Sequence, residues 1–504
     1  MTMSSPETAN KESNTASNSS IERTDDTRSY HGEANDAHDA QTVVSHMSVL
    51  ERVQTQLGFF NPRMKQVRRR IVVKFTSIYL TMGILMLGIF SIYWGSMMHR
   101  DDHMKYLKFL VAVEDVETID GVPPIFGNRV IDVVTSPEAR YYGDWQVYTP
   151  SNFSEIRPKH STGDTQADVE ELVHMQRYWG GLYIKQNSTH RLYEALLNAN
   201  TSYAAGNESW RFVYETGRDV ENVPTYIVPN SQIIEGMVLA HQNDMNSQLI
   251  DIIRQKGKNS AEILDKGLSV LSQPLDFESY DMRPSTQPVV MAPAQVGLVY
   301  LIIVTFFQFG FFIDFHKTVA GYPMKKPHYL LYRLLGSFLT YFWLSLIYSL
   351  VSLAFQIDFT KAFGRGGFPV YWMTMWLTMC ALGGMNEIMA HVLIMVFPPS
   401  LGFWLIFWVI ANVSCTFTPM TLTANFYRYG YALPVYNANE IIKVVFFDTY
   451  KGHMGRNYGI LVAWVVATNL MLAVVLPIFG KVMGKKGAKL RQQAEKEAAR
   501  QKSV

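Results

Sequence analysis

The sequence predicts a polytopic α-helical membrane protein with six transmembrane helices and an α/β extracellular domain between the first two. Three observations lead to this fold class. Apolar residues gather in six blocks, each nearly free of charge. Lysine and arginine cluster on one side of these blocks, as they do on the cytoplasmic side of membrane proteins. Sequons for N-glycosylation cluster on the other side.

The six apolar blocks have the length that a bilayer requires. A hydrocarbon core about 30 Å thick is crossed by roughly 20 apolar residues in a helix. The predicted spans are residues 72–94, 295–315, 334–355, 370–396, 401–417 and 458–479. Aromatic residues flank most of their ends, as expected of interfacial anchors. Buried helices of a soluble protein rarely run this far without charge, so membrane spans are the better interpretation.

The positive charges orient these spans. Basic residues precede the first helix, lie between the second and third, and follow the sixth; they include Arg68, Arg69, Arg70, Lys325, Lys326, Arg333, Lys485 and Lys486. In a six-helix topology these three segments share one side. The positive-inside rule therefore predicts that both termini are cytoplasmic.

Four sequons lie between the first and second helices, and they agree with this orientation. They begin at Asn152, Asn187, Asn200 and Asn207. Their position on the side that the charges place outside predicts a glycoprotein of a eukaryotic secretory membrane. Residues 1–40 are polar and contain no signal peptide, so the first helix is expected to act as an uncleaved signal anchor.

The segments outside the spans differ in composition. Residues 1–42 are polar and are predicted to form a disordered cytoplasmic tail. Residues 43–71 combine an amphipathic helix with a basic stop, and the helix either lies on the cytoplasmic leaflet or packs against cytoplasmic loops. Residues 480–504 form a basic cytoplasmic tail. Cys380 and Cys415 both lie in apolar blocks, so no disulfide framework is expected.

Residues 98–294 read as the α/β domain. Strands are predicted at 108–113, 179–184, 211–215 and 225–228, with one long helix over 231–256. A second polar segment, residues 420–457, is rich in aromatic residues and carries an amphipathic run over 437–447. That run is expected to lie in the outer interface or to dip against the bundle.

The sequence carries none of the common catalytic signatures. It has no phosphate-binding loop, no zinc motif, no nucleophile elbow and no dinucleotide fingerprint. We therefore expect no enzyme activity, no catalytic residue, no metal site and no cofactor. The expected partners are membrane lipids, a small-molecule substrate and further copies of the chain, and nucleic acid is not among them.

Ionisable residues inside the predicted fourth span are the sharpest functional signal. Glu387 and His391 are four residues apart, so they share one helix face and can pair, with Asn386 beside them. A carboxylate at that depth requires a partner or a watery cavity. One interpretation is a proton-binding or substrate-binding site. The other is a polar pair that holds helices together near the cytoplasmic end.

Several local motifs and the order of the parts resemble a known family. The motifs are residues 111–115 (VAVED), 178–184 (YWGGLYI) with 187–189 (NST), 214–219 (YETGRD) and 428–434 (RYGYALP). Together with one helix, an external domain and five more helices, they resemble the fungal nitrosoguanidine-resistance protein family. That family is related to the membrane domains of type-two ABC exporters and to the bacterial phage-infection-protein group. The resemblance covers about residues 70–485 and leaves out both tails.

The resemblance implies a plasma-membrane permease that contributes to drug or alkylating-agent resistance, by export of small molecules or lipids. Without a nucleotide-binding domain, such a transporter needs the proton gradient or a separate ATPase. The alternative is a membrane-organising or scaffold protein that affects lipid distribution and transports nothing.

Overall fold

The computed structural model describes residues 59–198, 200, 203, 209–256, 270, 274–275 and 277–502. The predicted tail 1–42, the amphipathic part of 43–71 and the sequon at Asn207 lie outside the described residues. The chain divides into two compact units, residues 1–80 and 81–504.

The described part of the first unit contains a capped turn near its start. The side chain of Asn61 accepts a hydrogen bond from the backbone N–H of Arg63 at 3.0 Å, and Pro62 occupies the first position of helix η1 (Pro62–Met64). Helix α2 (Lys65–Met97) follows and continues into the second unit. It begins seven residues before the predicted span, because the basic residues ahead of the apolar block are themselves good helix formers.

Five strands in the second unit form one mixed sheet. They are β1 (Lys108–Val113), β2 (Asp144–Tyr148), β3 (Gly180–Ile184), β4 (Trp210–Tyr214) and β5 (Phe277–Asp281). Their order is β2-β1-β3-β4-β5. Strand β1 pairs in parallel with β2 and β3, and β4 runs antiparallel to β3 and parallel to β5. The residues between α2 and the second long apolar helix thus form an α/β domain.

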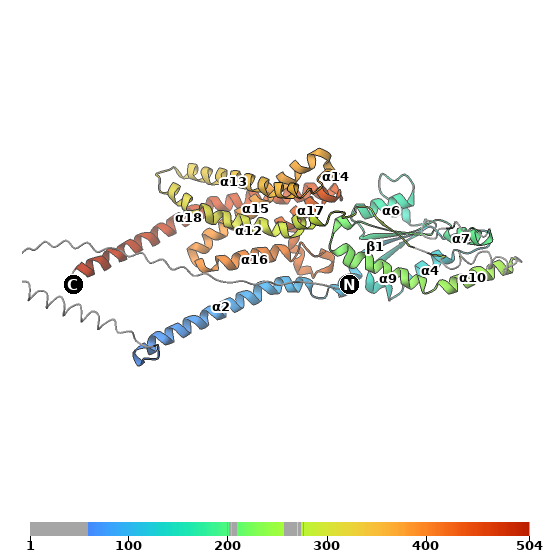
Figure 1. Ribbon diagram of the computed structural model, residues 1–504, viewed down its shortest axis with the longest axis horizontal. Coiled ribbons are helices and arrows are strands. Elements are labelled where there is room, and N and C mark those ends of the chain that lie inside the picture. Colours follow the sequence, from blue (N-terminus) through green and yellow to red (C-terminus); the bar gives the residue numbers. More distant parts are fainter. Residues whose placement is uncertain are drawn as a thin grey trace, which may run out of the picture. The chain divides into compact units, whose positions relative to one another are not determined.

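Helices cover both faces of this sheet (Figure 1). Phe109, Val111 and Val113 share one core with residues of α4 (Ile125–Val134), α7 (Ser188–Leu197), α9 (Val228–Leu239) and α10 (Gln242–Gln255). Leu110 and Ala112 pack in a second core with α6 (Thr165–His174). The apolar run of β1 is continuous because the strand is buried on both faces.

The predictions for this domain have mixed outcomes. The strands predicted at 108–113, 179–184 and 211–215 are confirmed within one residue as β1, β3 and β4. The strand predicted at 225–228 is wrong, because Val223–Ile227 form a π-helical turn that leads into α9. The single helix over 231–256 is also wrong, because the chain breaks between α9 and α10 at residues 240–241.

Within the residues that the structure describes, five helices are long and apolar enough to cross a membrane. Besides α2 they are α12 (Gly297–Ala320), α13 (Lys326–Ala354), α15 (Gly367–Val396) and α18 (Met454–Lys502). They correspond to the blocks predicted at 295–315, 334–355, 370–396 and 458–479. Helix α15 is central, because α12, α13, α16, α17 and α18 all pack against it (Figure 1).

The helix predicted at 401–417 is shorter than expected. Helix α16 (Leu401–Val413) has 13 residues, which span only about 20 Å at 1.5 Å per residue. It ends where hydroxyl and thiol side chains turn back onto backbone carbonyls; Thr416 Oγ1, for example, donates to the carbonyl of Asn412 at 2.7 Å. Such local bonds compete with helix continuation.

Helix α17 (Pro434–Phe447) contains the predicted amphipathic run and lies against the bundle. Its first turn is held by a residue of α16: Asn412 Oδ1 accepts a hydrogen bond from the N–H of Val435 at 3.4 Å. Ile442 and Val445 are buried in the same core as α15. Of the two placements expected from sequence, packing against the bundle is the one observed.

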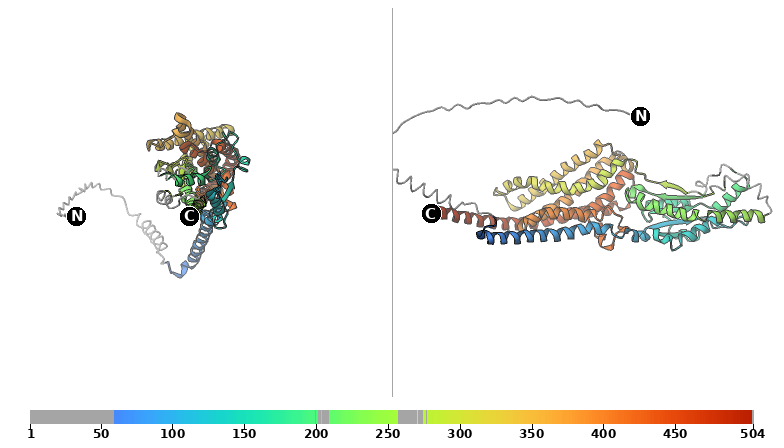
Figure 2. Two further views of the ribbon diagram at one scale, coloured as in Figure 1. Left: turned by 90° about the vertical axis from the view of Figure 1, so that its right-hand side faces the viewer. Right: turned by 60° about the horizontal axis from the view of Figure 1, so that its bottom comes forward.

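The predicted tail 480–504 is not separate from the last span. Helix α18 is continuous from Met454 to Lys502, and its last part projects beyond the other bundle helices (Figures 1 and 2). Lys, Arg, Gln, Glu and Ala favour helix, so the end of the apolar block did not mark the end of the helix. The shorter helices are α3 (Arg100–His103), α5 (Ala139–Tyr142) and α14 (Thr360–Phe363).

Candidate functional site

The carboxylate of Glu387 has a basic partner inside the bundle. Glu387 on α15 is 3% exposed and Arg333 on α13 is 2% exposed, so both charges are removed from solvent. Arg333 Nη2 donates to Glu387 Oε1, and Ser337 Oγ donates to Glu387 Oε2 at 3.4 Å. The pair joins α13 to α15 and neutralises the carboxylate that the sequence placed inside the predicted fourth span.

His391 does not form the expected side-chain pair with Glu387. Its Nδ1 lies 2.6 Å from the backbone carbonyl of Glu387, one helical turn earlier. Its ring packs edge-on against Phe309 and Phe479, with centroids 5.1 and 4.7 Å away. The four-residue spacing brings the two residues onto one face, but His391 uses that proximity for a backbone bond and aromatic packing.

Asn386 connects three helices. Its Nδ2 donates to the carbonyl of Ile302 and to Thr305 Oγ1 on α12, both at 3.1 Å. Its Oδ1 accepts from Trp404 Nε1 on α16 at 3.1 Å. These bonds fully occupy a buried amide in a packing role.

Arg333 is the residue that sequence reasoning misplaced. It was counted among the basic residues of the loop between two spans, but it lies within α13 and is fully buried. Its position just ahead of the apolar block at 334–355 hid this role. A buried carboxylate implies a buried cation, and Arg333 is the residue that supplies it.

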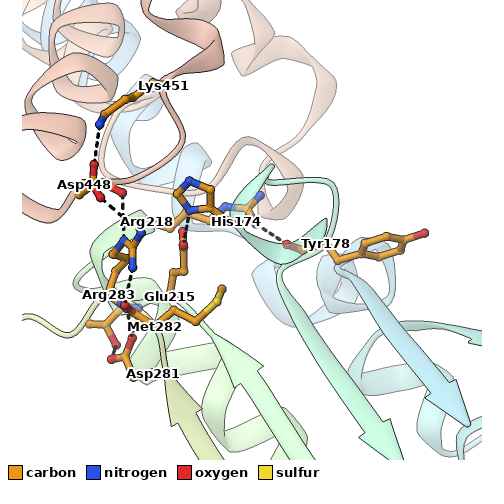
Figure 3. Close-up of polar contacts among 10 residues, drawn as sticks. His174, Tyr178, Glu215, Arg218, Asp281, Met282, Arg283, Asp448 and Lys451 are labelled. Atoms are coloured by element: carbon orange, nitrogen blue, oxygen red, sulfur yellow. Dashed lines mark hydrogen bonds and ion pairs between the residues drawn. The ribbon is translucent and has the colours of Figure 1, made fainter. Parts of the chain in front are cut away.

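The α/β domain rests on the ends of the bundle helices through polar contacts. Asn222 Nδ2 donates to the carbonyl of Phe417 at 3.1 Å. Arg283 donates to the backbone and side chain of Asp448, which also binds Lys451 at 2.9 Å (Figure 3). A side chain at Gly217 would collide with Phe447. The YETGRD motif therefore lies at this contact, and its glycine permits the close approach.

A cavity of about 1090 Å³ opens at this contact, and we refer to it as the junction cavity. It is lined by residues from five segments: before and at the start of β1, the start of β2, the loop after α6, the turn after β4, and the segment that follows α16. Its polar members are His103, Lys105, Lys108, Asp144, Gln176, Arg177, Arg218, Thr421, Thr423, Asn425 and Arg428. Six side chains in this set are basic and one is acidic, so the cavity favours anions.

Arg218 forms the inner wall of the junction cavity. Its guanidinium donates to the carbonyl of Tyr178 at 2.6 Å and lies 3.7 Å from the ring centroid of Trp179 (Figure 3 shows the first contact). Desolvation lowers the pKa of Arg218 to about 10, so it remains charged at neutral pH. Lys105, Lys108, Arg177 and Arg428 are exposed within the cavity.

A smaller cavity of about 280 Å³ adjoins the first and shares Arg218 and Trp179 with it. It reaches toward α17, where Glu440 and Lys443 form an ion pair at 2.5 Å. Asp219 also faces it, and burial raises the pKa of that carboxyl, partly opposed by Lys443 and Asn222. This inner part carries both signs of charge, whereas the outer part is basic.

The four sequons lie in different environments. Asn200 is exposed, Asn152 and Asn187 are half-buried, and Asn207 is outside the described residues. The sequon at Asn187 has a structural use as well. Its Thr189 is 1% exposed and donates through Oγ1 to Asp115 at 2.6 Å.

The long apolar helices define a polytopic membrane protein that carries an α/β domain between its first two spans. The chain belongs to a family described as "Protein of unknown function (DUF3533)", which matches residues 78–470. It is 33% identical over 455 residues to the "Uncharacterized endoplasmic reticulum membrane protein YJR015W" of Saccharomyces cerevisiae. That alignment covers 87% of this chain and 84% of the relative. No solved structure matches the chain.

Proposed function

We propose that this protein binds an anionic amphipathic molecule in the junction cavity and acts as a permease-like membrane protein. The observation that supports this proposal is the charge of the cavity, with five lysine and arginine side chains against one aspartate. A volume of about 1090 Å³ is sufficient for a drug-sized or lipid-headgroup ligand. From the resemblance to the nitrosoguanidine-resistance family, we further propose that the protein contributes to drug or alkylating-agent resistance.

The proposal includes a topology. Helix α16 completes six spans together with the five long helices, both termini are cytoplasmic, and the α/β domain is lumenal or extracellular. The positive-inside rule and the sequons support this orientation. The yeast relative is named for the endoplasmic reticulum membrane. We therefore place this chain first in that membrane, with the plasma membrane as the destination that the family resemblance implies.

A non-transporting, membrane-organising protein is the second candidate. The Arg333–Glu387 pair favours it, because the buried ion pair gives Glu387 a structural role in joining α13 to α15. In this version the junction cavity holds an anionic lipid without moving it across the bilayer. The two candidates share the ligand chemistry and differ in whether the ligand crosses.

Binding is tested with purified full-length protein and a fluorescent short-chain phosphatidylserine in detergent. Arg177→Gln with Arg428→Gln removes two exposed charges from the cavity and is expected to weaken binding roughly tenfold or more. Arg140→Gln with Lys159→Gln is the matched control, since both residues are exposed on the same domain outside the cavity. Equal losses in the two double variants would refute the cavity as the binding site.

Movement is tested with the same labelled lipid in proteoliposomes, with and without a pH gradient. A membrane-impermeant quencher distinguishes the two leaflets. If the protein moves labelled lipid from the inner leaflet to the outer leaflet, the quencher reaches more of the label. A gain in quenching that requires the protein, and that is smaller with Arg177→Gln and Arg428→Gln, supports the permease. Binding without any exchange between leaflets supports the membrane-organising protein.

A further inference from the structure

A second groove lies at the opposite end of α12 from the α/β domain. It has a volume of about 500 Å³ and is formed where α12 ends, α13 begins and α18 passes alongside. Residues from all three contribute, among them Met324, Lys326, Tyr329, Leu330, Leu476 and Lys481. Helices α13 and α18 each pack against α15.

The groove lies at the ends of two of the long apolar helices. Ala320 is the last residue of α12 and Lys326 the first of α13, and both line it. Tyr322 and Met324, in the turn between these helices, are 67% and 43% exposed. Aromatic and long apolar side chains at such ends are typical of the interface between headgroups and acyl chains.

The charges of the groove are both positive. Lys326 and Lys481 approach it from different helices, and none of the described residues that line it is acidic. In the part of the chain that the structure describes, neither lysine forms an ion pair or a side-chain hydrogen bond. Most of the remaining lining is apolar. Two cations above an apolar slot match a ligand with a negative head and hydrocarbon tails.

Pro477 adds a polar feature to the apolar wall. Proline has no backbone N–H, so the carbonyl of Ala473, four residues earlier, loses its usual donor within α18. Ala473 and Pro477 both line the groove. A carbonyl of this kind can accept a hydrogen bond from the ammonium or hydroxyl groups of a lipid headgroup.

We propose that this groove binds one acidic glycerophospholipid, with its phosphate between Lys326 and Lys481 and its acyl chains along Leu330 and Leu476. This site is separate from the junction cavity and does not depend on the proposed function. It predicts a preference for phosphatidylserine over phosphatidylcholine, because the choline headgroup leaves the lipid with no net charge.

The test is native mass spectrometry of the full-length protein in a neutral detergent, with phosphatidylserine or phosphatidylcholine added. Wild type is expected to retain phosphatidylserine preferentially. Lys326→Gln with Lys481→Gln should weaken that retention roughly 30-fold, since each basic side chain at a membrane surface contributes about a factor of five toward an acidic lipid. Lys485→Gln with Lys489→Gln removes the same charge from α18 outside the groove and should leave retention unchanged.

A variant that keeps the charge tests the groove independently. Gly480 lines the groove, and a Cβ at this position meets no atom within 4 Å, so Gly480→Leu is expected to extend into the open space of the groove. It should abolish retention of phosphatidylserine, whereas Gly487→Leu, also in open space on α18, should not. Equal retention of the two lipids by wild type, or unchanged retention in Gly480→Leu, would overturn the proposal, even if the lysine variant failed to fold.

Discussion

Arg333 and Glu387 illustrate how one buried pair constrains the bundle. Each alone would be a charge in a low-dielectric environment, at a cost of several kcal/mol. Together, with Ser337 on the second carboxylate oxygen, they form a neutral unit between α13 and α15. Arg333 Nε has no partner among the described residues, so the pair is held by one strong contact. The stability of the helix pair therefore depends on both members.

Glu387→Gln should lower the amount of folded protein sharply. It leaves the Arg333 guanidinium buried without its counter-charge, which costs about 3–5 kcal/mol. Replacing both residues, as Arg333→Met with Glu387→Leu, should recover much of the loss, because no charge then remains buried. Thermal unfolding and size-exclusion profiles in detergent provide the measurement. Asp314→Asn is the control, since that carboxylate is exposed and its loss should be nearly neutral. If Glu387→Gln unfolds at the same temperature as wild type, the Arg333–Glu387 ion pair does not stabilise the bundle.

Asp115 shows that two motifs of the sequence meet in space. It ends the VAVED motif after β1 and is 2% exposed. Its carboxylate accepts hydrogen bonds from the N–H groups of Gly127 and Thr189, at 3.1 and 3.2 Å, at the starts of α4 and α7. Burial raises the pKa of Asp115, although these donors oppose the shift. Residues 111–115 and 187–189 thus share a structural role that neither motif revealed alone.

Asp115→Asn should destabilise the α/β domain by about 1–3 kcal/mol. An amide offers one acceptor oxygen where the carboxylate offers two, so one buried N–H of α4 or α7 loses its partner. Thermal unfolding of the purified chain measures the change. Asp132→Asn serves as the matched control, because Asp132 is exposed on the same α4. A shift no larger than that of the control would show that Asp115 does not hold the two helices.

At the scale of elements, the sequence predicted what hydrophobic pattern alone determines. Strand β1 was found because all but its first residue are buried, so its apolar run is unbroken. Strands β2 and β5 were missed, because each lies at an edge of the sheet and mixes polar with apolar residues over only five positions. The break between α9 and α10 was missed because apolar residues recur at helical spacing through both helices, and those residues pack into one core.

The candidate sites were less predictable than the elements. Hydropathy identified Glu387, but its partner is 54 positions away on another helix, and only packing brings the two together. The junction cavity combines residues from five separate segments, none of which carries a motif for anion binding. The groove at Lys326 and Lys481 likewise depends on α13 and α18 flanking α15. Such sites are set by tertiary contacts, which one sequence does not encode locally.

At the scale of the whole molecule, charge and glycosylation signals separate along the chain. Lys326 and Lys481 meet at one end of α12, whereas the α/β domain, with its sequons, lies at the other. Crossing the bilayer between these ends requires roughly 30 Å, and the 24 residues of α12 provide about 36 Å. This separation is what the proposed topology, with a lumenal or extracellular domain, requires.

We therefore expect endoglycosidase treatment to increase the gel mobility of wild-type protein from a eukaryotic host, because it removes N-linked glycan. A variant with Asn152, Asn187, Asn200 and Asn207 changed to Gln should show no such shift. Asn200→Gln alone should remove part of the shift, because that side chain is exposed. Asn187→Gln should change little, since Ser188 and Thr189 are buried at the start of α7 in the folded domain. A protease-sensitive tag after Val504 reports the other side. In sealed microsomes, added protease reaches only the cytoplasmic side. Cleavage of the tag there, together with glycan on the wild type, supports a cytoplasmic C-terminus and a lumenal α/β domain. An unglycosylated wild type whose C-terminal tag is protected would reverse it.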